Sequence, residues 1–257
     1  MPFSSLGLSP ALLRAVSARA YAAPTAIQSA AIPAVLQGRD VLGSAQTGSG
    51  KTAAFALPLL QQLAQAPKEK PRHARTLVLV PTRELAAQVG EEFRSLAQHL
   101  ADPVKVTVVF GGVSINPQMM GLRGGTDIVV ATPGRLLDLI AHNALTLGSV
   151  ATLVLDEADR LLDLGFAEEL ERILALLPAK RQNLFFSATF PPAVQALAQT
   201  LLHEPVRVDV LPEPQNEPDI EQRAITVDAG KRTQLLRQLM AQHGWTRVLV
   251  FVATKHA

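Results

Sequence analysis

The sequence contains no cysteine, which excludes disulfide bonds and cysteine-ligated metal sites. Its six histidines are scattered and show no metal-site spacing. Aromatic residues make up only 4%, so Leu, Val and Ala must form most of any core. The 24 Lys and Arg residues nearly balance the 22 Asp and Glu residues. This balance is too even to imply a polyanionic ligand by itself.

No apolar run approaches the roughly 20 residues that a membrane-spanning helix needs. The first residues also lack the basic and then apolar pattern of a secretion signal. We therefore expect a cytoplasmic protein without a membrane partner. The chain has 257 residues, of which 48% are hydrophobic. That is enough for one large domain, or for one domain and part of another.

Apolar runs alternate with helical patterns through the first 210 residues. The expected strands cover residues 41–44, 76–80, 104–110, 127–130, 152–155, 183–186 and 206–210. The expected helices cover residues 50–65, 83–100, 134–141, 167–177 and 193–202. The strand runs are β-branched and do not alternate strictly, which is typical of parallel strands covered on both faces. The pattern predicts an α/β fold with a doubly wound parallel sheet that binds ligands at the carboxyl ends of its strands.

The composition changes after residue 210. Residues 211–219 carry three prolines and three acidic residues, so we expect a linker over residues 211–222. A strand at 223–227, a helix at 231–242 and a strand at 247–252 should follow. Fewer than about 40 residues rarely build their own core, so residues 223–257 are expected to open a second α/β domain whose remainder is missing. The alternative is an appendage that adds strands to the first sheet.

A glycine-rich segment joins the first expected strand to the helix after it. Its residues are Ala45-Gln46-Thr47-Gly48-Ser49-Gly50-Lys51-Thr52. The glycines let backbone N–H groups turn toward phosphate oxygens, and the helix N-terminus adds partial positive charge. Lys51 would reach the β- and γ-phosphates, and Thr52 would ligate Mg²⁺. The general pattern begins with glycine, whereas this chain has Ala45. The alternative is a glycine-rich turn with an incidental Lys-Thr pair.

The expected strand at 152–155 ends in Asp156-Glu157-Ala158-Asp159. One carboxylate can hold Mg²⁺ through water, and the next can orient an attacking water molecule. Acidic residues after a strand also cap helices, which is the alternative. Because the glycine-rich loop follows another strand of the same expected sheet, the two segments together favour a nucleoside triphosphate site. Its candidate catalytic residues are Lys51, Asp156 and Glu157.

Further short motifs lie before and after these two segments. They are Tyr21-Ala22-Ala23-Pro24-Thr25-Ala26-Ile27-Gln28, Pro81-Thr82-Arg83-Glu84-Leu85, Gly111-Gly112, Thr132-Pro133-Gly134-Arg135, Ser187-Ala188-Thr189 and Val250-Phe251-Val252-Ala253-Thr254-Lys255. With the two segments above, they resemble the DEAD-box ATP-dependent RNA helicases of superfamily 2, near the bacterial RhlE-like subgroup. The resemblance implies a RecA-like P-loop domain over residues 1–210, with the Q motif within 1–29. The linker and the start of a second RecA-like domain would follow.

The resemblance also implies the ligands, which are ATP, Mg²⁺ and RNA. ATP contacts are expected from Tyr21, Gln28, Ala45, Gln46, Thr47, Gly48, Ser49, Gly50, Lys51, Thr52 and Asp156, with Mg²⁺ at Thr52 and Asp156. RNA-backbone contacts, independent of base sequence, are expected from Pro81, Thr82, Arg83, Gly111, Gly112, Thr132, Pro133, Gly134 and Arg135. Coupling between the two ligands is expected from Asp159, Ser187, Ala188 and Thr189.

Two of these roles also suit the side chains themselves. The Gln28 amide can pair with the adenine edge, and the ring of Tyr21, the chain's one tyrosine, can stack on the base. The family usually has glycine before this aromatic residue, where the chain has Ala20. Without the resemblance, an exposed helical glutamine and ordinary helix caps explain the same residues.

In the family the resemblance suggests, a second domain brings arginines to the γ-phosphate and half of the RNA surface. The chain ends at Ala257, before such segments. We therefore expect the ATP-binding half of a helicase that couples ATP to RNA binding and local unwinding, and that alone binds ATP but hydrolyses it poorly. The alternatives are a short RNA- and ATP-binding module without unwinding activity, and a different P-loop DNA translocase.

Overall fold

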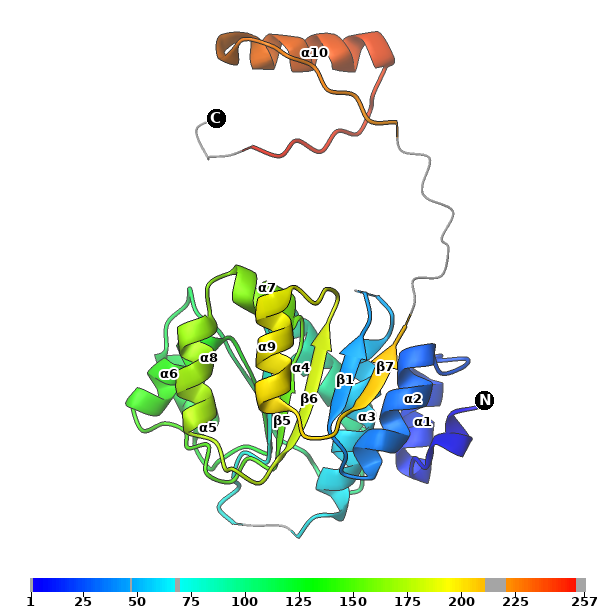
Figure 1. The fold of residues 1–257 in the computed structure, drawn as a ribbon, viewed down its shortest axis with the longest axis vertical. Coiled ribbons are helices and arrows are strands. Elements are labelled where there is room, and N and C mark those ends of the chain that lie inside the picture. The colour runs from blue at the N-terminus through cyan, green and yellow to red at the C-terminus, as the bar shows by residue number, and fades with distance from the viewer. Residues whose placement is uncertain (1, 47, 68–69, 211–220, 253–257) are drawn as a thin grey trace. The chain divides into compact units, whose positions relative to one another are not determined.

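The computed structural model describes residues 2–46, 48–67, 70–210 and 221–252 (Figure 1). The chain divides into two compact units, Met1–Pro212 and Glu213–Ala257, each described here by itself. Some expectations lie outside the described residues. These are Thr47 of the glycine-rich loop, residues 211–220 of the linker, and residues 253–255 of the last motif.

The first unit is built on a seven-stranded sheet in which neighbouring strands run parallel. The strands are β1 (Val41–Ser44), β2 (Thr76–Leu79), β3 (Val106–Val109), β4 (Ile128–Ala131), β5 (Thr152–Leu155), β6 (Gln182–Ser187) and β7 (Val206–Asp209). Their order across the sheet is β3-β4-β2-β5-β6-β1-β7. The expected doubly wound parallel sheet is therefore confirmed.

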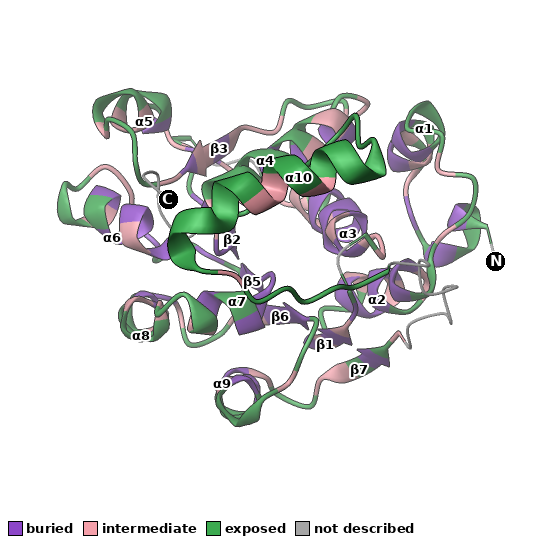
Figure 2. Ribbon diagram, turned by 90° about the horizontal axis from the view of Figure 1, so that it is seen from above, coloured by how far each residue is buried: buried purple, intermediate pink, exposed green. Residues whose placement is uncertain are grey.

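Helices cover both faces of this sheet (Figure 2). One face carries α1 (Pro10–Ala18), α2 (Ala26–Leu36), α3 (Lys51–Gln65) and α4 (Arg83–Ala97). The other carries α6 (Pro133–Ala141), α7 (Ala158–Asp163), α8 (Ala167–Ala175) and α9 (Pro192–Leu201), with α5 (Asn116–Leu122) packed beside β3.

The strands contribute to two cores at once. Val78 of β2 packs in the cluster of α1 to α4, whereas its neighbours Leu77 and Leu79 pack in the opposite cluster. This alternation follows from the pleat of a strand that is buried on both faces. In the first cluster the Phe55 ring of α3 lies 5.5 Å from the Phe186 ring of β6, measured between centroids. Aromatic packing therefore joins α3, the helix that follows the glycine-rich loop, to the sheet.

Several helices begin where the sequence predicts. Thr82 caps α4, because its Oγ1 accepts a hydrogen bond from the N–H of Leu85 at 3.2 Å. Pro192 begins α9, next to the expected start at residue 193, as proline in the first turn favours. Pro10 likewise begins α1, which is not among the expected helices. The sequence analysis did not give α2, α5 or α7. Helix α2 is apolar around most of its circumference and so shows no helical stripe, while α5 and α7 have only seven and six residues.

In the second unit, a short 3-10 helix (Ala229–Lys231) leads into α10 (Arg232–His243), where a helix was expected. The strands expected at 223–227 and 247–252 are not formed. Leu249 and Phe251 are 80% and 89% exposed, and the described residues give these segments no partner strand. Apolar, β-branched composition predicts a strand only where a neighbour completes the ladder. The described strands of the first sheet all precede residue 211.

Candidate functional site

The glycine-rich segment forms the turn from β1 into α3. Gly48 and Gly50 have φ of 86° and 89°, in the left-handed region that glycine adopts readily. Ala45, which stands where the general pattern has glycine, is buried, and its N–H donates to the Ser187 carbonyl at 3.1 Å. Lys51 is the first residue of α3. The loop therefore leads into a helix N-terminus, which is the geometry that binds phosphate.

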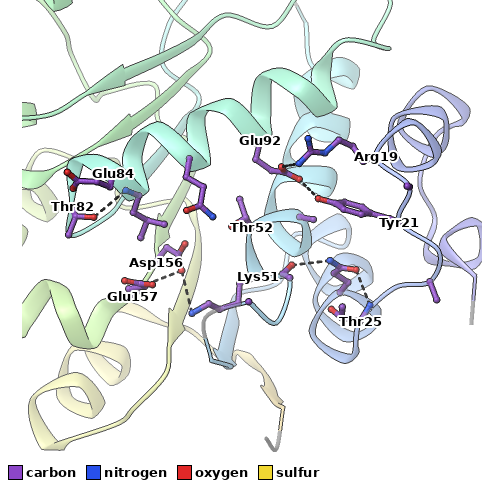
Figure 3. A pocket seen from close by; sticks show the side chains of 18 of the residues that line it. Arg19, Tyr21, Thr25, Lys51, Thr52, Thr82, Glu84, Glu92, Asp156 and Glu157 are labelled. Carbon is purple, nitrogen blue, oxygen red and sulfur yellow. Dashed lines mark hydrogen bonds and ion pairs between the residues drawn. The ribbon is translucent and has the colours of Figure 1, made fainter. Parts of the chain in front are cut away.

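Lys51 points into the protein beside Asp156 (Figure 3). Their side chains are 7% and 3% exposed, and Lys51 Nζ lies 3.9 Å from Asp156 Oδ1. Among the residues that the structure describes, neither Lys51 Nζ nor Ser49 Oγ has a hydrogen-bond partner. Buried polar atoms are normally paired, so these two atoms mark a place that suits a polar ligand. The sequence analysis predicted that Lys51 and Asp156 share one site, and the structure places their side chains next to each other.

Burial raises the pKa of Asp156 to about 6. The Lys51 ammonium opposes this rise, whereas the carboxylates of Glu157 and Asp159 add to it. One cation thus offsets only part of the penalty on the charged form. The site is therefore electrostatically suited to additional positive charge.

Glu157 occupies a strained turn between β5 and α7. Its φ of 53° and ψ of 53° are sparsely populated by residues other than glycine. The turn buries the Glu157 side chain and sets its Oε2 2.9 Å from Arg160 Nη1. Its N–H donates to Asp156 Oδ1 at 3.0 Å, so the two carboxylates lie side by side. The sequence analysis missed Arg160, although its position three residues on is a helical pairing distance.

Asp159 joins this turn to the end of β6. Its Oδ2 accepts hydrogen bonds from the Thr189 N–H at 2.9 Å and the Thr189 hydroxyl at 2.8 Å. Its own N–H donates to Ser187 Oγ at 3.2 Å. Burial pushes the pKa of Asp159 upward, but the bonds from Thr189 and Ser187 outweigh it and lower that pKa below its usual value. Ala188 lies between Ser187 and Thr189 and is exposed. The contacts expected of this segment are present, while its coupling role stays a prediction.

A cavity of about 750 Å³ opens over the glycine-rich loop, a volume typical of ligand sites. Its walls come from the segment before α2, from the loop, from α4 and from the end of β5. The lining includes Tyr21, Thr25, Gln28, Gly48, Gly50, Lys51, Thr52, Thr82, Glu92, Asp156, Glu157 and Arg160. Seven of the expected nucleotide contacts thus face one space, whereas Ala45, Gln46 and Ser49 are not among the residues that line it.

Gln28 is buried in this wall and holds the loop. Its Oε1 accepts from the Thr25 N–H at 3.0 Å, and its Nε2 donates to the Gly50 carbonyl at 3.1 Å. A primary amide has two N–H donors and two acceptor positions, so one of each remains for a ligand. The structure therefore shows a support role that sequence reasoning missed, and the adenine contact stays a prediction.

Tyr21 reaches the same cavity through an unusual turn. Ala20 has a φ of 54°, which explains why glycine is common at this position in the resembling family. The Tyr21 hydroxyl donates to Glu92 Oε1 of α4 at 2.6 Å. Glu92 lies 71 residues further along the chain, so no local pattern could have selected it.

The residues expected to contact RNA follow three neighbouring strands. Pro81, Thr82 and Arg83 follow β2, Gly111 and Gly112 follow β3, and Thr132, Pro133, Gly134 and Arg135 follow β4. Because β3, β4 and β2 are adjacent and parallel, their carboxyl ends lie along one stretch of the sheet edge. The cavity over the glycine-rich loop lies along the next stretch, at the carboxyl ends of β5 and β1.

The exposure of the two arginines on this edge differs. The Arg83 side chain is 60% exposed, so its guanidinium is accessible to a ligand. Arg135 is buried, and its Nη2 donates to the Val113 carbonyl of the loop after β3 at 2.7 Å. Arg135 thus ties two of the expected RNA-contacting segments together. Direct contact of either arginine with RNA stays a prediction.

These features define a class of protein. A parallel α/β sheet with a glycine-rich loop into a helix N-terminus, and acids at a nearby strand end, is the arrangement of P-loop nucleotide-binding domains.

Comparison with known proteins gives the family. Residues 25–197 match the family described as DEAD/DEAH box helicase. This chain therefore belongs to the DEAD/DEAH box helicase family. A crystal structure of a DEAD box protein from the hyperthermophile Methanococcus jannaschii is similar, with a TM-score of 0.74 and 35% identity over 93% of this chain and 63% of that one. The expected RecA-like fold is thereby confirmed.

Similar curated proteins carry the name ATP-dependent RNA helicase DeaD. The one from Escherichia coli (strain K12) is 42% identical over 255 residues, which cover 99% of this chain and 40% of that protein. The one from Buchnera aphidicola subsp. Baizongia pistaciae is 41% identical over 257 residues, covering 100% of this chain and 42% of that protein. The chain thus spans about two fifths of the length of these relatives. The RhlE-like subgroup stays a prediction.

In the part of the chain that the structure describes, no helix combines the length and apolar character needed to cross a bilayer.

Proposed function

We propose that this chain is the ATP-binding part of an ATP-dependent RNA helicase. The observation that best supports this proposal is the environment of the Lys51 ammonium. It is buried, lacks a hydrogen-bond partner among the described residues, and lies 3.9 Å from Asp156. A buried cation that pairs with a carboxylate at 3.9 Å but has no hydrogen-bond partner among the described residues is poorly stabilised. A triphosphate in the cavity would supply the missing acceptors, with its phosphates against the loop after β1.

The residues present fit a Mg²⁺ ion that accompanies the nucleotide. Asp156 and Thr52 line the cavity beside Lys51. The described residues form no cluster of three or more His, Cys, Asp or Glu, and Mg²⁺ needs none, because phosphates and waters complete its shell. When bound, the ion would neutralise charge on the phosphates. Glu157, held by Arg160, would orient the attacking water.

The same edge of the sheet supports RNA binding. The exposed Arg83 side chain gives charge, and the helix N-termini after Thr82 and Thr132 offer N–H groups to phosphates. Such groups read the backbone rather than the bases, so binding should be independent of sequence and should weaken steeply as salt rises. The relatives' printed name, ATP-dependent RNA helicase, supports RNA as the polymer.

We assign residues 1–210 to the ATP-binding domain, 211–222 to a linker and 223–257 to the start of a second RecA-like domain. The division of the chain into units at Pro212 supports this assignment. The complete protein would couple ATP hydrolysis to local duplex unwinding. We expect the chain alone to bind ATP and hydrolyse it slowly, because loss of an arginine supplied by a partner domain lowers phosphoryl transfer by about 10³- to 10⁵-fold.

Titration calorimetry with ADP and Mg²⁺ tests the nucleotide site. Lys51→Ala should abolish measurable binding, whereas Lys105→Ala, a lysine outside the cavity, should bind like the parent. GDP should bind more weakly than ADP, and the difference should shrink in Gln28→Ala. Unchanged binding by Lys51→Ala would overturn the assignment.

Phosphate release tests the polymer and the turnover. With ATP, the chain alone should release phosphate slowly, with or without RNA. The complete protein should be stimulated by RNA more than by DNA of the same sequence, and less so at higher salt. A preference for DNA would point to a DNA translocase instead.

A further inference from the structure

A carboxylate outside the acidic motif controls the base side of the cavity. Glu92 lies in the third turn of α4. Its Oε1 accepts from the Tyr21 hydroxyl at 2.6 Å, and its Oε2 accepts from Arg19 Nη2 at 2.7 Å (Figure 3). The Glu92 side chain is only 12% exposed. Both oxygens therefore hold one short stretch of chain, the stretch that carries the base-side ring.

That stretch has little support of its own. Residues 21–25 form neither helix nor strand, and they follow the left-handed turn at Ala20. The Tyr21 ring meets Phe3, with centroids 6.4 Å apart and planes inclined by 25°, and the Arg19 guanidinium lies 5.9 Å from the ring centroid. One of these two partners, Arg19, is bonded to the Glu92 carboxylate, and so is the hydroxyl of Tyr21 itself. Charge-assisted hydrogen bonds of this length are among the stronger ones in proteins.

We propose that Glu92 is a positioning residue for the nucleotide base, which acts by fixing the Tyr21 ring and the Arg19 guanidinium at the wall of the cavity. This inference rests on the proposed function, since it requires a base in that space. Stacking uses the ring face and needs no hydroxyl. The hydroxyl serves as a handle by which α4 sets the orientation of the ring. Glu92 itself would touch neither the phosphates nor the reacting water.

The first experiment needs no nucleotide. Tyr21 is the chain's one tyrosine, so the ultraviolet absorbance of phenolate during an alkaline titration reports this residue alone. Burial and the hydrogen bond to Glu92 raise the pKa of Tyr21 above its usual value. Glu92→Gln removes the negative charge at similar volume and should lower that pKa. Glu91→Gln is the matched control, because the neighbouring Glu91 carboxylate pairs with Arg94 instead. An unchanged titration in Glu92→Gln would refute the contact.

The second experiment separates positioning from general structure. Binding of ADP and of inorganic tripolyphosphate, each with Mg²⁺, is measured for the parent, Glu92→Ala, Glu92→Gln and Glu91→Gln. Glu92→Ala should weaken ADP binding by roughly five- to tenfold, as for the loss of one hydrogen bond, and should leave tripolyphosphate binding unchanged. Equal loss of both ligands would mean a general structural role and would overturn the proposal.

The Tyr21→Phe substitution tests the role of the hydroxyl directly, because it deletes only that group. It should weaken ADP binding in the same direction as Glu92→Gln, and the two changes should combine to less than their sum, since they remove one contact. Additive effects would show that Glu92 acts by another route. If the folded parent bound neither ADP nor tripolyphosphate, the proposed nucleotide site itself would fail, even where the titration confirmed the contact.

Discussion

Two glycines of the phosphate loop differ in one measurable way. Gly48 and Gly50 have nearly the same φ, 86° and 89°. A Cβ at Gly48 would meet no atom of the described residues within 4 Å, whereas a Cβ at Gly50 would lie 2.5 Å from Gln28 Nε2 and 3.1 Å from Thr25 Oγ1. Gly48→Ala therefore carries only the left-handed backbone strain, about 1–2 kcal/mol. Gly50→Ala carries a similar strain and also displaces Gln28, whose bond to the Gly50 carbonyl contributes about 1 kcal/mol.

We therefore expect Gly50→Ala to lower the free energy of unfolding by about 2–3 kcal/mol, which is about 1 kcal/mol more than Gly48→Ala. Urea unfolding followed by far-ultraviolet circular dichroism is the assay. The one tryptophan, Trp245, lies in the second unit, so its fluorescence would not follow the loop.

Gln28→Ala provides the internal check. In that background the Cβ at residue 50 no longer meets the amide, so the two glycine substitutions should become nearly equal in their effect. If both cause the same loss in the parent, Gln28 does not support the loop. If their difference persists in Gln28→Ala, it comes from the backbone and the close approach is irrelevant.

Three further outcomes are expected. Glu157→Gln should leave ADP binding intact and block hydrolysis in the complete protein, and equal phosphate release by both forms would contradict the water-orienting role. The folded pKa of Asp156, about 6, lies above its ordinary 3.8, so in metal-free buffer the parent loses stability as pH rises through that interval. Asp156→Asn lacks this group. In urea unfolding its stability should therefore gain about 3 kcal/mol relative to that of the parent between pH 4 and pH 7. Asp159 has a lowered pKa, so its contribution is lost only below about pH 4, and Asp159→Asn should show no such gain. Amide hydrogen exchange should be faster in α10, which buries no residue, than in β2, and equal protection would show that α10 is docked.

Much of the first unit was predictable because its strands are buried on both faces. Runs such as residues 152–155 need only apolar, β-branched composition to be recognised, and the glycine-rich and acidic segments follow two of those runs directly. The sheet order then follows no sequence rule, yet it decides which loops meet. The position of β5 in the sheet order sets Asp156 between the expected RNA contacts after β2 and the glycine-rich loop after β1.

The supporting contacts could not be predicted in the same way. Glu92 and Tyr21 are distant in sequence, and a glutamate on an amphipathic helix usually indicates a solvated face. Gln28 was expected only to bind a base, and its grip on Gly50 depends on how α2 packs against α3. Arg135 was expected to contact RNA, which stays a prediction, and its bond to the Val113 carbonyl could not be read from the sequence. In each case the role depends on packing between elements that are far apart along the chain.

The spacing of the two expected ligand sites follows from backbone bonds at the sheet edge. The Thr132 N–H donates to the Val109 carbonyl, the Val80 N–H to the Ala131 carbonyl, and the Asp156 N–H to the Leu79 carbonyl, at 3.0–3.1 Å. These bonds extend the ladders of β3, β4, β2 and β5 past their last strand residues. A ladder of this kind is buried and rigid, so it holds the sites at a fixed separation.

If both ligands bind as proposed, we expect communication between them to use the segments that leave the edge. The strained turn at Glu157, the bonds from Asp159 to Ser187 and Thr189, and the α4 helix all lie beside the cavity and outside the sheet. Helix α4 contacts both expected sites. Thr82, an expected RNA contact, precedes its first residue, and Glu92 in its third turn accepts the hydrogen bond from Tyr21 at the cavity wall. If binding at one site shifted α4, the contacts at the other site would change without any movement of the strands. We therefore expect substitutions in these segments, more than in the strands, to alter how RNA and nucleotide affect each other's binding.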